Sequence, residues 1–422
     1  MTKKKNLTNF FETFLDKQPL FIDKKVLQAG YTPETIPHRE EQIEQIASII
    51  APCLRLEKPS NLFLYGKTGT GKTLSVKYVI EQINETAKKK NLSIGSYYLN
   101  CKLKRVSDTE YRLIAQLARE LGIIVPPTGL PTDEVYRLFI KGIDKSNKKI
   151  IILVLDEIDQ LVNKAGDEIL YNLTRLSSEL KNVEISLIGI SNDLMFTDNL
   201  DPRIKSSLSE EEIVFPPYNA LQIQDILKQR AKFAFRPDVL EEGVIEKCAA
   251  YAAREHGDAR RALALLRVAG ELAERKNQTK IFITHIDDAE EKIERDKILD
   301  IVHTQPKQFK VILLSIFNKV NKTKEIIFTG DIYDIYKDYC SKCGLKPLTQ
   351  RRVSDIIAEL DMLGIINAKV ISKGRYGRTR EISLAIPDST IPTLNQALME
   401  GLNLWTPMKT KPYSKQLLKK VS

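Results

Sequence analysis

Five apolar runs of strand length recur in the first half of the chain, and a stretch with helical spacing separates each run from the next. The runs are Asn61–Tyr65, Ile94–Leu99, Ile150–Leu155, Ile185–Ile190 and Glu212–Phe215. Strands that are apolar on both faces and alternate with helices are typical of a parallel sheet covered on each side. We therefore predict an α/β fold with such a sheet. Pro216 and Pro217 mark the end of this part of the chain.

The second half of the chain shows two other patterns. Over about 220–297 the apolar positions follow the helical period throughout, which predicts a small all-helical module. The segment His303–Gln308 has the composition of a linker, and a third unit fills about 308–395. No pattern assigns the segment Asn395–Ser422, which holds the only tryptophan, Trp405.

Composition narrows the class of protein. With 42% hydrophobic and 28% charged residues over 422 positions, the chain can bury several cores, which argues against a disordered chain. No apolar run reaches the ~18–20 residues that cross a bilayer, and the basic N-terminus lacks the apolar core of a secretory signal. The five cysteines are sparse and odd in number, which indicates a reducing compartment. We expect a cytoplasmic protein with no membrane partner.

The excess positive charge lies at one end of the chain. Of the 65 basic and 55 acidic residues, residues 301–422 hold 20 and 10. The first 300 residues therefore carry 45 of each sign and are neutral overall. A basic unit attached to a neutral one predicts a polyanionic partner such as nucleic acid, and a solubilising surface is the alternative.

A phosphate-binding motif follows the first predicted strand and precedes a helix predicted over Thr73–Lys88. It fits G-x-x-x-x-G-K-[ST] and consists of Gly66, Lys67, Thr68, Gly69, Thr70, Gly71, Lys72 and Thr73. The glycines let backbone N–H groups face phosphate oxygens, and the helix N-terminus adds its positive dipole. In this pattern Lys72 reaches the β- and γ-phosphates, and Thr73 binds Mg²⁺. The motif therefore predicts a nucleoside triphosphate site.

Polar side chains come directly after two later strands of the predicted sheet. Asp156 and Glu157 follow the third apolar run, and Asn192 follows the fourth by two residues. The carboxyl ends of parallel strands meet at one edge, where ligands bind in open α/β sheets. We therefore expect Asp156 to hold Mg²⁺, Glu157 to act on the attacking water, and Asn192 to contact that water and the γ-phosphate. Asp159 is expected to cap a helix.

Taken together, the motifs resemble those of AAA+ ATPases. They are GKTGTGKT, LVLDEID, ISN, LDPRIKSSL, FPPY and GDARRAL. The set is most similar to the archaeal replication initiators related to the eukaryotic origin recognition complex and its helicase-loading partner. The likeness runs from about Gly30 to Leu384. It implies a AAA+ base domain, a helical lid and a C-terminal winged helix, with ATP or ADP and Mg²⁺ as ligands.

The resemblance also implies roles for residues outside the phosphate loop. The segment around Ile36 is similar to the one that packs around adenine in this family, and two further positions lie where base and lid meet at the nucleotide. The implied nucleotide-binding residues beyond the loop are Ile36, Pro37, Arg39, Leu74, Tyr218, Arg230 and Arg260. Arg260 matches the lid arginine that reaches the γ-phosphate, with Arg261 as the competing choice. Asp258 can cap a helix that places Arg260 in its first turn.

Arg203 matches the position at which AAA+ proteins present an arginine to a neighbour's nucleotide. Such an arginine stabilises transition-state charge and is worth about 10³–10⁵ in rate. Ser206 and Ser207 stand where some relatives have another basic residue, so a structural salt bridge is the alternative for Arg203. The four histidines are not spaced as metal ligands.

Lys72 and Asp156 lie 84 positions apart in the sequence, which is more than one strand–helix unit needs. This spacing predicts two helices, at about Asp108–Leu121 and Thr132–Asp144. The resemblance identifies them as the initiator-specific insertion, which touches DNA. Lys102, Lys104 and Arg105 lie just before it, and a solvated charged face is the alternative reading of these three residues.

The third unit has the pattern of a winged helix-turn-helix. Helices are predicted at about 306–320, 329–343 and 349–363, and strands at about 365–372 and 378–385. The apolar residues of the last helix fall on one face, which leaves Gln350, Arg351 and Arg352 outward at its start. Recognition helices use their N-terminal residues on base edges in the major groove.

A cationic hairpin completes this unit. Residues 369–380 hold five basic residues and no acidic one, and GRYGRT is similar to the wing of the initiators. Glycines at the tip let such a hairpin approach the minor groove or the phosphates closely. The predicted DNA contacts are Gln350, Arg351, Arg352, Lys373, Gly374, Arg375, Tyr376, Arg378 and Arg380. The alternative is a winged helix used only for protein contact.

Patterns and resemblance together divide the chain into five parts. We expect a flexible basic arm over 1–20, a AAA+ base domain over 21–217, a helical lid over 218–300, a winged helix over 301–395 and a basic tail over 396–422.

The implied function is ATP-dependent initiation of DNA replication. Such a protein binds double-stranded origin DNA, hydrolyses ATP slowly as a regulatory step and helps to recruit the replicative helicase. A second initiator copy or a paralogue is a further expected partner, and the expected location is the nucleoid in the cytoplasm. Two alternatives stay open. One is a clamp-loader-type AAA+ subunit, against which the winged helix argues, and the other is a nucleotide-locked DNA-binding regulator with little ATPase activity.

Overall fold

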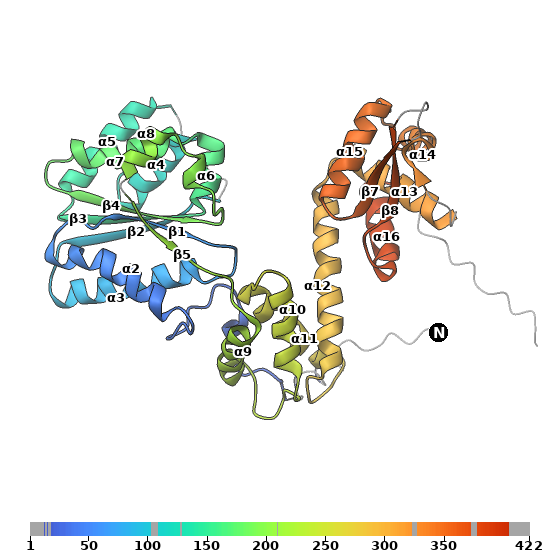
Figure 1. The fold of residues 1–422 in the computed structure, drawn as a ribbon, viewed down its shortest axis with the longest axis horizontal. Coiled ribbons are helices and arrows are strands. Elements are labelled where there is room, and N and C mark those ends of the chain that lie inside the picture. The colour runs from blue at the N-terminus through green and yellow to red at the C-terminus, as the bar shows by residue number, and fades with distance from the viewer. Residues whose placement is uncertain are drawn as a thin grey trace, which may run out of the picture. The chain divides into compact units, whose positions relative to one another are not determined.

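The computed structural model describes residues 12, 15, 18–102, 109–126, 129–208, 210–322, 327–372 and 378–404. The chain divides into two compact units, one up to Ala289 and one from Glu290 onward. The first contains a parallel sheet and three lid helices, and the second contains the winged helix (Figure 1).

A parallel sheet of five strands forms the centre of the first unit, which confirms the predicted fold class. Its strands are β1 (Asn61–Tyr65), β2 (Ile94–Asn100), β3 (Ile150–Asp156), β4 (Glu184–Ser191) and β5 (Glu210–Val214), in the order β2-β3-β4-β1-β5. β3 and β4 run beyond the predicted apolar ends, so Asp156 and Ser191 are strand residues. β5 begins two residues early, because an edge strand tolerates the charged Glu211 where it pairs with Leu62.

Alternate residues of the buried strand β3 enter two different hydrophobic cores. Ile152 and Val154 pack on the side of α2 (Glu40–Ile50) and α3 (Lys72–Lys89). Leu153 and Leu155 pack on the opposite side (Figure 1). The helices there are α4 (Glu110–Glu120), α5 (Thr132–Lys145), α6 (Ile158–Ala165), α7 (Glu168–Glu179) and α8 (Pro202–Leu208). α4 and α5 are the two helices predicted for the insertion, within two residues of their expected bounds.

Three helices form the lid: α9 (Ala220–Ala234), α10 (Val244–Arg254) and α11 (Ala259–Arg275). Asn219 and Gln222 form a capping box at the start of α9. Asp258 caps α11, as predicted, because its carboxylate accepts hydrogen bonds from the backbone N–H groups of Arg260 and Arg261.

Residues 18–39, here called the N-terminal strap, connect the lid to the sheet. The centroid of the Phe21 ring lies 4.7 Å from the centroid of the Phe235 ring of the lid. Lys24 Nζ lies 2.8 Å from a carboxylate oxygen of Glu274 on α11. The first part of the strap therefore packs on the lid, although it precedes the base domain in sequence.

The second unit builds its core from helices and a small antiparallel sheet. The helices are α12 (Ile283–Thr304), whose first residues, up to Ala289, belong to the first unit, α13 (Lys307–Lys322), α14 (Thr329–Lys342), α15 (Gln350–Met362) and α16 (Ile391–Gly401). The strands are β6 (Ile327–Phe328), β7 (Ile366–Ser372) and β8 (Arg378–Leu384). The strand order is β6-β8-β7. The expected linker His303–Gln308 is wrong, because α12 reaches Thr304 and α13 begins directly after Pro306, where a proline fits a helix start. Neither β6, which has two residues, nor α16 was predicted.

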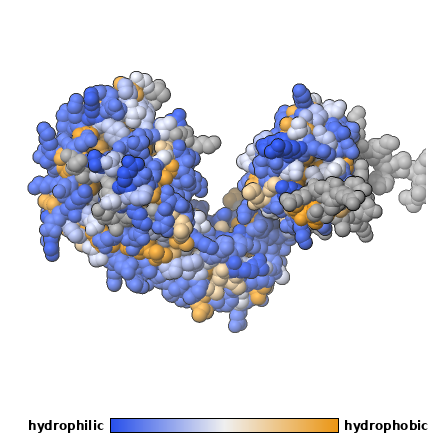
Figure 2. All heavy atoms as spheres, turned by 45° about the horizontal axis from the view of Figure 1, so that its top comes forward, coloured by the Kyte–Doolittle hydropathy of each residue, from blue (hydrophilic) through white to orange (hydrophobic). Residues whose placement is uncertain are grey.

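None of the helices among the described residues is long and apolar enough to cross a membrane. Figure 2 shows mainly hydrophilic residues on the visible surface, with hydrophobic residues in small separate patches. Scattered apolar side chains of this kind are ordinary on folded proteins.

Candidate nucleotide site and DNA interface

The phosphate loop connects β1 to the N-terminus of α3, as predicted. Gly69 and Gly71 have left-handed φ angles of +72° and +96°. A Cβ on Gly71 would lie 2.8 Å from the Tyr218 hydroxyl, and one on Gly66 would lie 2.5 Å from the Phe215 carbonyl oxygen. Only glycine fits these positions, so the local backbone requires the motif that the sequence displays.

Lys72 lies buried beneath the loop. Its ammonium group donates to the carbonyl oxygens of Gly66 (2.6 Å) and Lys67 (2.8 Å) and to Asn192 Oδ1 (3.0 Å). Burial, and next the Arg260 guanidinium, lower the pKa of Lys72 to about 8. The loop lysine therefore lies close to both the strand-end asparagine and the lid arginine.

Asp156 and Thr73 form a pair of oxygen donors at the carboxyl edge of the sheet. Thr73 Oγ1 donates to Asp156 Oδ2 at 3.0 Å, and the Glu157 N–H donates to Asp156 Oδ1 at 2.9 Å. Carboxylate and hydroxyl oxygens are the hard ligands that Mg²⁺ prefers, and a buried carboxylate favours a cation beside it. The residues present therefore fit a magnesium ion.

Glu157 stands beside this pair in an unusual backbone conformation. Its φ of +55° lies in the left-handed region, which costs a non-glycine residue energy and is characteristic of functional sites. Its carboxylate lies 3.5 Å from the exposed Lys102 Nζ. Of the basic residues predicted before the insertion, Lys102 is thus paired with the predicted catalytic acid, and Lys104 and Arg105 lie outside the described residues.

Two further residues of this edge were missed or misassigned. Asp159 does not cap a helix, because Glu157 occupies the N-cap of α6. Its buried carboxylate instead accepts hydrogen bonds from the Ser191 hydroxyl (3.4 Å) and the Asn192 N–H (3.3 Å), which positions Asn192. Tyr98 of β2 donates its hydroxyl to Asp156 Oδ2 at 2.5 Å, and burial together with that hydrogen bond raises the pKa of the phenol. Sequence spacing contains no signal for either contact.

A cavity of about 290 Å³ opens beside the loop, between the strap and the lid. The predicted nucleotide-binding residues that line it are Ile36, Pro37, Gly69, Gly71, Thr73, Leu74, Tyr218, Arg230 and Arg260. The Arg230 guanidinium lies 4.7 Å from the centroid of the Tyr31 ring, so lid and strap meet across the cavity. A partly apolar cleft of this size with a few polar groups is typical of a small-molecule site.

Arg39 is buried and does not line this cavity. Its guanidinium donates to the backbone carbonyl oxygens of Thr70 (2.8 Å) and Pro216 (2.5 Å) and lies 3.9 Å from the centroid of the Tyr218 ring. In this structure Arg39 therefore holds the loop against the junction between base and lid.

The lid touches the loop directly. The Ala259 N–H donates to the Gly69 carbonyl oxygen at 3.3 Å, and Lys67 Nζ lies 3.3 Å from His256 Nδ1. The first turn of α11 carries Arg260, so these contacts set where that arginine enters the cavity.

Arg203 lies on the surface of the first unit. The Arg203 side chain on α8 is 87% exposed and pairs with Asp201 at 3.1 Å, and it is not among the described residues that line the cavity.

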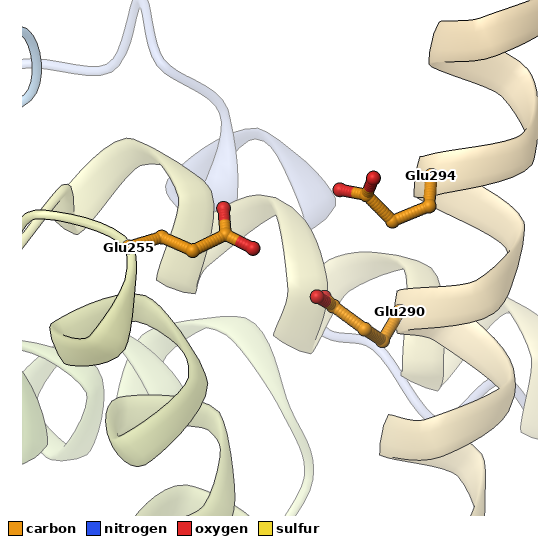
Figure 3. Close-up of side chains that lie close together, drawn as sticks. All are labelled: Glu255, Glu290 and Glu294. Carbon is orange, nitrogen blue, oxygen red and sulfur yellow. The ribbon is translucent and has the colours of Figure 1, made fainter. Parts of the chain in front are cut away.

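Figure 3 shows Glu255 after α10, and Glu290 and Glu294 one turn apart on α12. Glu255 pairs with Arg261 at 2.7 Å, and acidic side chains of this kind are common without a metal ion.

The N-terminal turn of α15 presents polar side chains to solvent. Thr349 caps the helix and accepts a hydrogen bond from the Arg352 N–H, and Val353 points into the core. Gln350, Arg351 and Arg352 are exposed, and Arg352 lies 3.4 Å from Glu359. The face predicted for base contacts is therefore accessible in this unit.

The predicted wing is only partly described. β7 and β8 pair with Val370 opposite Arg380, so the hairpin is present. Lys373, Gly374, Arg375 and Tyr376 lie outside the described residues, and Arg378 is the first residue of β8.

Three family models match the chain. They are the AAA domain over residues 55–194, the Cdc6 AAA+ ATPase-type lid domain over 224–291, and the CDC6 C-terminal winged helix domain over 300–393. Their order along the chain is the order of sheet, lid and winged helix in the structure.

Individual proteins match over most of the chain. The ORC1-type DNA replication protein of Pyrococcus horikoshii is 53% identical over 385 residues, 90% of this chain and 91% of that protein. ORC1-type DNA replication protein 1 of Methanosarcina mazei is 50% identical over 406 residues, 96% of each chain. The solved structure of the Aeropyrum pernix ORC1 protein in complex with DNA is 45% identical, with a TM-score of 0.79, and covers 91% of this chain and 98% of that one. The chain therefore belongs to the family of ORC1-type DNA replication proteins.

Proposed function

We propose that this protein is an ATP-dependent initiator of DNA replication that binds double-stranded origin DNA. Its family supports a role in replication, and the relative from Aeropyrum pernix was solved with DNA. One observation carries the proposal. One chain carries both a phosphate loop and a winged helix. Beside the loop, the oxygens of Thr73 and Asp156 lie 3.0 Å apart. In the winged helix, α15 begins with the exposed residues Arg351 and Arg352.

Nucleotide binding would use the groups around the phosphate loop. Backbone N–H groups from Lys67 to Thr73 and the start of α3 would hold the phosphates, with Lys72 as the cation beneath them. The base would enter the cavity between the strap and the lid. Thr73 and Asp156 would hold Mg²⁺. The chemistry that Mg²⁺ supplies when bound is neutralisation of phosphate charge.

Hydrolysis would be slow and regulatory. Glu157 would take the proton of the attacking water, and Asn192 would orient that water, since its amide is fixed by Lys72 and its backbone by Asp159. Arg260 would act on the γ-phosphate from within the chain. Arg203 is exposed and would serve a neighbour's nucleotide, so a lone chain lacks a complete set of groups.

DNA binding would divide between positioning and recognition. Gln350, Arg351 and Arg352 at the start of α15 would face base edges in the major groove. The wing, with Lys373, Gly374, Arg375, Tyr376, Arg378 and Arg380, would contact phosphates or the minor groove. Lys102, beside the insertion, offers a further cation from the base domain.

A protein that marks origins would help to recruit the replicative helicase and would act beside another copy or a paralogue on the nucleoid. The winged helix favours this function over that of a clamp-loader subunit. The pairing of Glu157 with Lys102 favours, as a second candidate, a nucleotide-locked regulator that binds DNA with little ATPase activity.

Substitution of Lys72 tests the nucleotide site. We expect Lys72→Ala to abolish binding of ATP and ADP, measured by titration with a fluorescent nucleotide, and to leave most of the affinity for duplex DNA. Lys88→Ala removes an exposed lysine from the last turn of the same helix and serves as the matched control. Loss of DNA binding in Lys72→Ala alone would contradict the division between a nucleotide unit and a DNA unit.

Substitution of Arg351 or Arg380 tests the DNA interface. We expect either change to alanine to weaken binding to duplex DNA in fluorescence anisotropy. Loss of one phosphate contact makes the negative slope of log affinity against log salt shallower by about 1. Loss of a base contact costs about 1–3 kcal/mol of binding free energy at one position of the DNA site. Affinities equal to those of Lys88→Ala at every salt concentration would remove the winged helix from the proposal.

A further inference from the structure

Tyr98 lies on the strand next to the magnesium ligand, on the same face of the sheet. β2 pairs with β3 so that Tyr98 stands beside Val154, and Asp156 follows two residues later on the same face. Aromatic side chains reach such diagonal neighbours across a strand pair. The Tyr98 hydroxyl donates to Asp156 Oδ2 at 2.5 Å.

This hydrogen bond completes the set of contacts around the Asp156 carboxylate. Oδ2 accepts from both Tyr98 and Thr73, and Oδ1 accepts from the Glu157 N–H at 2.9 Å. Thr73 is itself an expected ligand of the ion, and the Glu157 N–H holds the other oxygen. Tyr98 is therefore the one side-chain donor in this described set that is not expected to bind Mg²⁺ itself.

The Tyr98 ring is held from the nucleotide side. β2 is an edge strand, and Tyr98 is 36% exposed, so part of its ring faces solvent. Lys77 Nζ on α3 lies 4.3 Å from the ring centroid, a cation–π contact. Lys77 also lines the nucleotide cavity. The ring thus contacts a residue of the helix that follows the phosphate loop.

We propose that Tyr98 is a positioning residue for the magnesium site. Its hydroxyl holds the Asp156 carboxylate beside the Thr73 hydroxyl before the ion binds, and Lys77 holds the Tyr98 ring in place. The proposal rests on the proposed nucleotide and magnesium site.

A residue that hydrogen-bonds to a metal-binding side chain restricts the rotation of that side chain and tunes its basicity. Loss of such a residue typically lowers metal affinity by about 10–100-fold. A ligand that is already oriented pays less entropy when the ion arrives. Removal of the Tyr98 hydroxyl is therefore expected to weaken metal binding and to spare the contacts that the nucleotide makes with the loop.

The test compares Tyr98→Phe with Tyr97→Phe in the full chain. Tyr97 is adjacent, but it lies on the opposite face of the sheet and packs against the other core. A fluorescent ADP analogue is titrated first in EDTA and then at rising Mg²⁺. For Tyr98→Phe we expect an unchanged dissociation constant in EDTA and a half-saturating Mg²⁺ concentration raised about 10-fold. Mn²⁺ binding followed by electron paramagnetic resonance is expected to weaken by the same factor.

The possible outcomes separate this role from the proposed function. A half-saturating Mg²⁺ concentration for Tyr98→Phe that is equal to or lower than that of the wild type overturns the positioning role. The hydroxyl then contributes nothing or competes with the ion. An equal loss of affinity in EDTA and in Mg²⁺ also overturns it, because the effect is then not specific to the metal. A wild-type chain whose nucleotide affinity does not respond to Mg²⁺ overturns the magnesium site itself, and this shows without any variant.

Discussion

Gly69 is the point at which the phosphate loop meets the lid, and an alanine there measures that contact. A Cβ on Gly69 would lie 1.8 Å from Asp258 Oδ1 and 3.0 Å from Asp258 Cα. Ordinary contact begins at 3.4 Å, so the carboxylate oxygen must move by 1.6 Å. The same oxygen caps α11 by accepting from the N–H groups of Arg260 (2.8 Å) and Arg261 (3.3 Å). Gly69→Ala therefore breaks the cap of the helix that carries Arg260.

The magnitude follows from two contributions. A left-handed residue with a Cβ costs about 1 kcal/mol, and loss of an aspartate cap costs about 1 kcal/mol more. We expect Gly69→Ala to lower the free energy of unfolding of the first unit by about 2 kcal/mol. Gly122→Ala is the matched control, because Gly122 has a φ of +78° and no heavy atom within 4 Å of its added Cβ. It should cost only the backbone strain, about 1 kcal/mol.

Urea unfolding followed by circular dichroism measures both variants, and a double-mutant cycle with Asp258→Ala identifies the cause. Asp258→Ala alone should cost about 1 kcal/mol. The double variant should cost about 2 kcal/mol, less than the sum of the single variants, because the cap can be lost only once. A cost for Gly69→Ala equal to that of Gly122→Ala, or an additive double variant, would refute the reasoning.

Three further predictions concern pH, helix capping and the exposed arginine. The pKa of Lys72 falls from its ordinary 10.5 to about 8 on folding, so the unfolded chain binds more protons between those values. The free energy of unfolding of the wild type should therefore rise relative to Lys72→Met as pH increases from about 8 to 10.5, in urea titrations at fixed pH. Thr349→Ala should lower the stability of the second unit by about 1 kcal/mol by thermal unfolding, since it removes the cap of α15. Arg203→Ala should leave the nucleotide affinity of the single chain unchanged and lower ATP turnover only at concentrations where copies associate, whereas lower turnover in dilute protein would contradict a role between subunits.

Much of the fold was predictable because the elements obey local rules. The alternation of apolar runs and helices indicated the parallel sheet, and the G-x-x-x-x-G-K-T spacing placed the loop between β1 and α3. Elements without a local signal were not predicted. β6 has only two residues and exists because it pairs with β8, which no pattern along the chain records. The expected linker failed because a proline can begin a helix as well as end one.

The site shows the same division. Asp156, Asn192 and Lys72 could be placed together from sequence alone, because parallel strands deliver their carboxyl ends to one edge and the loop joins that edge to a helix. Tyr98 and Asp159 could not be, since their roles depend on register between strands and on which side of a helix turn faces the core. Arg39 has a sequence position near the base-binding segment, yet tertiary packing directs it to backbone carbonyl oxygens.

By itself, the sequence determined the phosphate loop, the two acids at the end of β3, the order of sheet, lid and winged helix, and the basic character of the last part of the chain. These features depend on residue type and on spacing over a few positions, which the chain carries wherever it folds. The tertiary structure alone decided that the strap packs on the lid, that the lid touches Gly69, and that Tyr98 orients Asp156. Those contacts join residues that are far apart in sequence, and only the packing of the folded chain brings them within hydrogen-bonding distance.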